Sequence, residues 1–218
     1  MKNESMIMGM KITESEKERL YLDKNKIISN IAMGIRYLTI PPIMVSTLLS
    51  YLFLGKRELF NSATDFIMSI FFLAAFPILA YAVHFLVPVF KAKGRDLQRK
   101  MAFIFTGIGY VLATGYGFLA GCTDGLKILF VSLLIIYSIN INKVIKVKAS
   151  GHSCGISGLL IFCAYFGGLY TIIFNMILYM LTLWASVRTK RHTKKEFILG
   201  SIICLVSFSV VAPIISLF

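Results

Sequence analysis

Long apolar stretches separated by short polar segments dominate this chain, and uncharged runs of about 20 residues recur along it. Runs of that length suit helices that cross a bilayer, because lipid offers the backbone no hydrogen-bond partner and a helix satisfies its own. Polar and apolar residues do not alternate as they do in the strands of membrane barrels. The pattern predicts an all-α, polytopic transmembrane helical bundle.

Seven apolar segments give about six or seven expected spans. Arg36 and Pro41-Pro42 interrupt the first segment, which should therefore be kinked or begin near Tyr37. The uncharged run after His152 is too long for one crossing, and Gly167-Gly168 divides it into a helical hairpin that returns to its starting face. The segments are 27–55, 66–90, 101–121, 128–142, the two halves of 153–187, and 197–218.

Composition and charge indicate the surroundings of these helices. Of all residues, 57% are hydrophobic and 15% are charged, against about 25% charged in a typical soluble domain. A net charge of +13 would suit nucleic acid in a soluble protein, but here the cations flank apolar segments. Anionic lipid headgroups and a phosphorylated substrate are therefore the expected partners, and nucleic acid is not. The four dispersed cysteines are expected to be packing residues rather than a disulfide or metal framework.

Residues 1–26 are polar and mixed in charge, unlike a signal peptide, and should form a cytosolic or interfacial segment ahead of a transmembrane domain at 27–218. Lys and Arg concentrate on the face predicted to hold this segment, which leaves Lys56, Arg57 and Lys127 on the other. The positive-inside rule then makes the N-terminus cytoplasmic. Many of those cations lie where phosphate is expected to bind, so the rule does not determine which membrane face carries the site.

Two polar islands lie between apolar runs. The first covers residues 146–155 and the second 188–196, and each holds one histidine beside hydroxyls and cations. Because the hairpin between them returns to its starting face, the islands should meet there, together with a basic loop at 91–100. The remaining histidine, His84, stands among apolar neighbours and is expected to be a hydrogen-bonded packing residue.

Each island carries residues suited to phosphate chemistry. Ser150-Gly151-His152 should begin a helix, where unpartnered N–H groups attract phosphate, Gly151 permits close approach, Ser150 caps the helix and His152 can donate a proton. His192 and Glu196 are four apart and should share a helix face, so that the carboxylate accepts the Nδ1 proton and Nε2 keeps its lone pair. Gly200, further along, allows close packing.

These residues resemble a known family. Ser150-Gly151-His152, and Lys190-Arg191-His192-Thr193 with Glu196 and Gly200, are similar to the second and third signature motifs of the type 2 phosphatidic acid phosphatase (PAP2) superfamily, which includes lipid phosphate and undecaprenyl-diphosphate phosphatases. The resemblance covers about Lys91 to Gly200.

The resemblance implies an integral membrane phosphatase of PAP2 type that needs no metal or other cofactor. Its substrate would be a phosphatidate or a polyprenyl diphosphate, and its location a bacterial-type plasma membrane. His192 would be the nucleophile that forms a phosphohistidine, and Glu196 would orient it. His152 would protonate the leaving group and then activate water.

The sequence also departs from the family motifs. The first motif has Lys, six residues and then Arg-Pro, and its nearest match is Lys93 with Lys100 or Arg99, without the proline. Ala149 stands where the family has proline, Glu196 where it has aspartate, and Ser186 where it has an arginine six residues before the nucleophile. The residues expected to bind phosphate are Lys93, Arg99, Lys100, Ser150, Gly151, Arg188 and Arg191.

Other interpretations stay open. A catalytically impaired relative that binds anionic lipid or a partner fits the departures at Met101, Ala149 and Ser186. The intact His152, His192 and Glu196 favour an enzyme. A small transporter fits less well, because no charge lies in the middle of a span. A membrane cysteine peptidase also fits less well, because Cys154 has no separate base to activate it.

Overall fold

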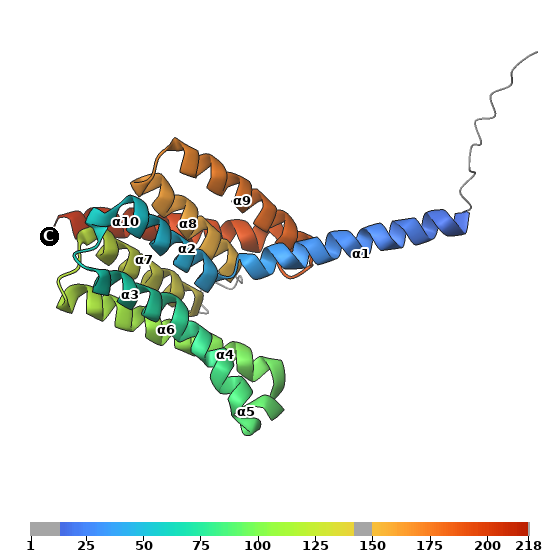
Figure 1. Cartoon of the computed structure of the whole chain (residues 1–218), viewed down its shortest axis with the longest axis horizontal. Helices are drawn as coiled ribbons and strands as arrows, with labels where there is room; N and C mark the ends of the chain where they lie inside the picture. Colours follow the sequence, from blue (N-terminus) through green and yellow to red (C-terminus); the bar gives the residue numbers. More distant parts are fainter. Residues whose placement is uncertain (1–13, 142–149, 218) are drawn as a thin grey trace, which may run out of the picture.

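The computed structural model describes residues 14–141 and 150–217, and every regular element in these ranges is a helix. The all-helical class predicted from the sequence is therefore confirmed. Figure 1 shows the helices packed side by side, with α1 extending far out of the bundle. The elements are α1 (Glu14–Leu38), α2 (Pro41–Gly55), η1 (Arg57–Leu59), α3 (Ala63–Ile70), the π-helical η2 (Phe71–Ala75), α4 (Phe76–Leu86), α5 (Pro88–Ala92), α6 (Gly94–Leu119), α7 (Asp124–Ile141), α8 (Gly151–Phe166), α9 (Leu169–Arg188) and α10 (Lys194–Ser216).

Four helices of the described ranges are long and apolar enough to cross a membrane, namely Ala63–Leu86, Gly94–Leu119, Leu169–Arg188 and Lys194–Ser216. Tyr21–Leu38 and Pro41–Gly55 raise the number to five if this bent pair forms one span, and His152–Phe166 is a shorter apolar helix. Large apolar side chains cover the outer faces of these helices, as on α9 at Ile177 and Leu181. Such surfaces suit lipid rather than water, as expected of an integral membrane protein.

A proline pair follows the bend in the first candidate span, and Pro77 lies in the second. α1 and α2 meet at an angle of 56°, and Pro41 and Pro42 occupy the first positions of α2, where a missing N–H costs no internal hydrogen bond. The predicted kink in the first apolar segment is therefore confirmed. In the second span the π-helical turn η2 comes directly before α4, which has Pro77 at its start.

The N-terminal segment and the basic loop are more helical than the sequence indicated. α1 runs unbroken from Glu14 across residue 26, and residues 1–13 lie outside the described ranges. The stretch 91–100 belongs to α5 and the first turns of α6, with a break at Lys93. Gly94 allows this tight connection because it adopts a positive φ of 69°.

The expected packing residues lie inside the bundle. His84 is buried, and its Nε2 donates to the carbonyl oxygen of Gly94 at 3.1 Å. Cys122, Cys163 and Cys204 are buried free thiols. The prediction for His84 is confirmed, and three of the four cysteines are buried as expected of packing residues, while Cys154 is half-buried.

The hairpin predicted at Gly167-Gly168 is present. α8 ends at Phe166, Gly167 donates its N–H to the carbonyl of Cys163, and α9 begins at Leu169. A side chain at Gly167 would collide with that same carbonyl, so the turn requires glycine. The hairpin brings the start of α8 and the end of α9 to one end of the bundle.

The start of α8 packs directly on the first turns of α10. A Cβ atom on Gly200 would lie 3.0 Å from the Ser150 carbonyl oxygen and 3.0 Å from Ser153 Cβ, so the helices approach as closely as glycine allows. The Ser150 N–H donates to the Glu196 carbonyl at 3.2 Å, and the Ser153 hydroxyl donates to the Phe197 carbonyl. Close packing at Gly200, expected from the sequence, is confirmed.

A network of hydroxyl groups extends this contact into the bundle. Ser201 Oγ lies 2.9 Å from Ser153 Oγ, 2.9 Å from Ser157 Oγ and 2.8 Å from the Tyr179 hydroxyl. Hydroxyl pairs of this kind hold apolar helices together where the hydrophobic effect is weak. The network joins α8, α9 and α10 below the islands.

We expect Gly200→Ala to destabilise the protein by about 1–3 kcal/mol, because the added methyl forces α8 away from α10. The measurement is thermal unfolding in detergent. Gly115→Ala on α6 is the matched control, since nothing lies within 4 Å of its added methyl, and it should be neutral or stabilising. Equal melting temperatures for the Gly200→Ala variant and the native chain would contradict the tight contact.

Candidate active site

The first island caps a helix as predicted. Ser150 precedes α8 with extended backbone angles, and its Oγ accepts from the Ser153 N–H at 3.3 Å. Gly151 is the first residue of α8, and His152 lies in its first turn. The preceding residues Lys146, Lys148 and Ala149 lie outside the described residues.

The second island begins with a tight turn at the end of α9. Lys190 has a positive φ of 52° and donates its N–H to the Val187 carbonyl, while Arg191 donates to the Ser186 carbonyl at 3.3 Å. These two bonds form a Schellman motif, in which glycine is usual at the position of Lys190. The motif ends α9 and turns the chain back toward α10.

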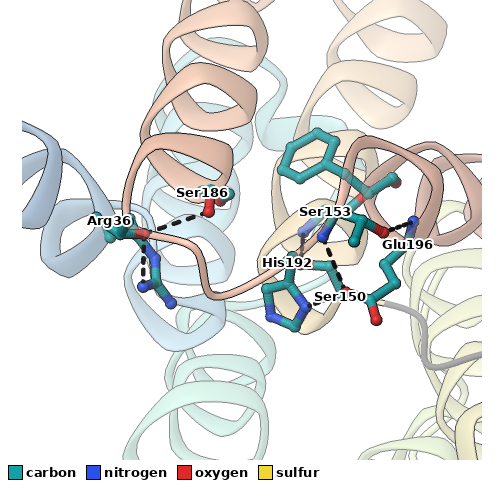
Figure 2. Close-up of polar contacts among 9 residues, drawn as sticks. Arg36, Ser150, Ser153, Ser186, His192 and Glu196 are labelled. Carbon is teal, nitrogen blue, oxygen red and sulfur yellow. Dashed lines mark hydrogen bonds and ion pairs between the residues drawn. The ribbon is translucent and has the colours of Figure 1, made fainter.

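Glu196 holds both the start of α10 and the ring of His192. Thr193 caps the helix by accepting from the Glu196 N–H at 3.2 Å, and Glu196 Oε2 accepts from the Thr193 N–H at 3.0 Å. The same Oε2 lies 3.1 Å from His192 Nδ1. Figure 2 shows His192 and Glu196 beside Ser150 and Ser153.

This arrangement corrects one prediction. His192 was expected to share a helix face with Glu196, but it precedes the cap residue Thr193 and lies outside α10. The contact forms because Glu196 bends back over the helix start to complete the capping box, which brings its carboxylate to the preceding residue. A carboxylate only accepts, so Nδ1 carries the proton and Nε2 of the neutral ring carries the lone pair.

His152 lies beside the Arg36 cation rather than a carboxylate. Its Nε2 lies 3.2 Å from the backbone carbonyl oxygen of Arg36, which can only accept, so Nε2 is the donor and Nδ1 of the neutral ring carries the lone pair. His152 lies outside the candidate spans, and burial lowers its pKa. The Arg36 charge lowers this pKa further, and His192 lowers it as well. The hydrogen bond to the Arg36 carbonyl acts in the opposite direction and raises the pKa. The two imidazoles are therefore close enough to interact, as the predicted meeting of the islands requires.

Arg36 is the site residue that the sequence analysis missed. Its Nη1 donates to Thr189 Oγ1 at 3.0 Å, across 153 positions of sequence. Figure 2 shows its side chain beside the end of α9 that carries Ser186. A single charge interrupting an apolar run is the signal that could have identified it, because such charges are costly in a membrane and often functional.

The predicted phosphate-binding residues divide into two groups. Ser150, Gly151 and Arg191 lie around the two histidines, and Arg191 is near enough to Arg36 to interact electrostatically. Arg188 instead donates to Asn25 Oδ1 at 2.7 Å on an exposed part of α1.

The basic residues of α6 form a separate region. Lys93, Arg99 and Lys100 are exposed, and the helices that mainly pack on α6 are α4, α5, η2 and α7. Figure 1 shows α5 and the start of α6 projecting beside α4, apart from the meeting point of α8, α9 and α10. The structure therefore does not bring these three cations to the histidines.

No group of three or more His, Cys, Asp or Glu side chains that could hold a metal ion occurs among the described residues. The groups gathered here are two imidazoles, one carboxylate, two guanidinium groups and the N–H groups at the start of α8. Together they can bind an anion and transfer a proton.

Comparisons of the chain with protein-family models, with curated proteins and with solved structures find no significant match.

We expect His152 to make folding stability depend on pH. Its pKa in the folded protein lies below the unfolded value near 6.5, so the unfolded chain binds a proton more readily. Stability is therefore full above about pH 6.5 and falls below it, by at most about 1.4 kcal/mol per pH unit. The measurement is thermal unfolding from about pH 8 to pH 5.

The control variant for this experiment is His152→Gln, which keeps an N–H donor for the Arg36 carbonyl but has no charge to gain. It should lose less stability than the native chain over the same pH range. Parallel curves for the two proteins would show that His152 is not the titrating group.

Proposed function

We propose that the chain is an integral membrane lipid phosphatase that hydrolyses a phosphomonoester or diphosphate of a lipid through a phosphohistidine. The observation that carries the proposal is the convergence of two imidazoles held in different ways. His192 is oriented through Nδ1 by Glu196, and His152 lies at a helix start beside Arg36. The resemblance to the motifs of the type 2 phosphatidic acid phosphatases supports the same chemistry, and the proposal includes the six or seven spans expected from the sequence.

In the first step the Nε2 lone pair of His192 attacks phosphorus, and the bond from phosphorus to the leaving oxygen breaks. Glu196 stabilises the positive charge that develops on the ring. Imidazolium His152 gives its proton to the leaving oxygen, and the lipid alcohol or lipid monophosphate departs. Guanidinium groups and the N–H groups at the start of α8 bind the equatorial oxygens.

In the second step water attacks the phosphohistidine. Neutral His152 takes a proton from the water, the water oxygen bonds to phosphorus, and the phosphorus–nitrogen bond breaks to release phosphate and restore His192. The lowered pKa of His152 suits this second role. A bound phosphate offsets the nearby cations and raises that pKa, which favours the protonated form needed in the first step.

The location of the pair suits a lipid substrate. Both islands lie at helix ends beside apolar surface, so a headgroup can meet the cations while its tail stays in the membrane. Catalytic groups at the water-facing end of a helical bundle need no buried path for the phosphate. A phosphatidate or a polyprenyl diphosphate meets these requirements.

A second candidate is a catalytically impaired relative that binds anionic lipid or a partner protein. The exposed cations of α6 favour it, because they lie apart from the histidines and resemble a headgroup-binding surface. Phosphate release by the purified protein in detergent with EDTA, from phosphatidate and from polyprenyl diphosphate, separates the two. Sustained turnover supports the enzyme, whereas lipid binding without turnover supports the impaired relative.

Replacing His192 with alanine should lower phosphate release by about 10⁴-fold or more, because the nucleophile is lost. The variant should also form no phosphohistidine. This is measured by reacting the protein with a substrate that carries radioactive phosphorus, quenching without acid, and detecting label on the protein. His84→Gln is the matched control, since it removes a histidine that donates only to the Gly94 carbonyl. Full turnover in the His192→Ala variant would exclude the assigned nucleophile.

The Glu196→Gln variant tests whether Glu196 orients the His192 ring, without disturbing the fold. Glutamine at this position also completes a capping box, so the start of α10 should keep its structure. Because the neutral amide no longer stabilises a charged ring, kcat should fall by about 10²–10⁴-fold with little change in KM. An unchanged kcat would remove Glu196 from the mechanism.

A further inference from the structure

Arg36 is held at both ends by the segments that carry the two islands. Its backbone carbonyl accepts from His152 Nε2, and its Nη1 donates to Thr189 Oγ1. Thr189 is fixed in turn, because its hydroxyl lies 2.8 Å from the Ala185 carbonyl and 3.3 Å from the Ser186 carbonyl. The guanidinium is thus placed beside the last turn of α9, next to the turn that leads to His192.

The charges around Arg36 favour an anion. Arg191 is close enough to interact with it, and no carboxylate of the described residues forms an ion pair with Arg36. Glu196, the acidic residue of the two islands, contacts His192 and the Thr193 N–H instead. Two neighbouring cations repel each other, and an anion between them offsets the repulsion.

Two buried polar atoms here also lack partners. Arg36 Nε and Ser186 Oγ are among the few buried side-chain atoms of the described residues with no hydrogen bond, and Ser186 is 0% exposed. Within the described ranges the bond to Thr189 is the one side-chain hydrogen bond of Arg36, although guanidinium has five donors. Buried donors without partners are uncommon and point to a ligand that completes them.

We propose that Arg36, supplied by α1, is the arginine that binds the phosphoryl group at this site, with Arg191 as the second cation. The inference rests on the proposed function and assigns its phosphate contact to a helix outside the two islands. Ser186 in the last turn of α9 carries no positive charge for a phosphate, whereas the guanidinium of Arg36 lies beside that turn. The guanidinium group of arginine donates to two phosphate oxygens at once, which the single ammonium group of lysine does not.

The ligand is a phosphate group, carried by a lipid headgroup or free in solution. Its binding to the full chain in detergent is measured by calorimetry in two arms, with orthovanadate and with short-chain phosphatidate. Arg36→Gln should weaken both by about 10- to 100-fold, as expected for the loss of a charge-assisted donor. Arg36→Lys should recover less than half of the lost binding free energy, because it restores the charge without the fork.

Arg57→Gln is the matched control, since it removes one exposed arginine at the opposite end of α2 from Arg36. It should change the affinity less than two-fold. Weakening by Arg36→Gln in both arms supports recognition of the phosphate group itself, and weakening with phosphatidate alone supports recognition of a lipid headgroup. Unchanged affinity in both arms overturns the proposal.

If Arg36→Gln does not fold, a second variant tests the proposal by placing the arginine on α9 instead of α1. The double variant Arg36→Ala with Ser186→Arg returns a guanidinium to the same turn from α9 and should recover vanadate binding relative to Arg36→Ala. Failure of this recovery in a folded protein argues against the proposal. If the native chain binds vanadate through Arg36 but releases no phosphate, the proposed function is wrong and this inference still holds. If Arg36→Gln keeps full turnover, this inference is wrong and the proposed function still holds.

Discussion

The close contact between α8 and α10 is the constraint on which the site depends. Because Gly200 has no side chain, the Ser150 N–H can reach the Glu196 carbonyl, and this one backbone bond joins two segments that are far apart in the sequence. The hydroxyl network around Ser201 fixes the same helices from below. The framework is therefore set by glycine and serine packing, as is common between helices in membranes. The chemical groups then lie at helix ends, where N–H groups point outward.

The two imidazoles have opposite surroundings. His192 faces a carboxylate that fixes its tautomer, whereas His152 faces a carbonyl oxygen and lies near the positive charge of Arg36. One ring is thereby suited to supply a lone pair, and the protonation of the other depends on what is bound nearby. In the proposed mechanism substrate binding and proton transfer are coupled, since an anion beside Arg36 is what makes imidazolium His152 favourable.

The position of Arg36 makes the N-terminal helix part of the site. The bend before Pro41 sends α2 back into the bundle while α1 passes the end of α9, and Pro41 itself packs against α8, with its Cα 3.3 Å from a Cβ atom built on Gly155. Among the described residues Arg36 and Arg191 have no carboxylate as an ion-pair partner, so their mutual repulsion costs stability. An anion bound between them, as proposed above, would offset that cost.

Local features were determined by the sequence alone. The lengths of the apolar runs predicted helices, Gly167-Gly168 predicted the hairpin, and Ser150 predicted a cap, because each depends on energies set within a few neighbouring residues. The contact of His192 with Glu196 was also predicted, although only the fold showed that it forms ahead of the helix. Tertiary structure decided three other features. Arg188 contacts Asn25, the α6 cations lie apart from the histidines, and Arg36 reaches the end of α9. The physical reason is that these positions depend on the bend between α1 and α2 and on helix packing across more than a hundred residues, which no local pattern encodes.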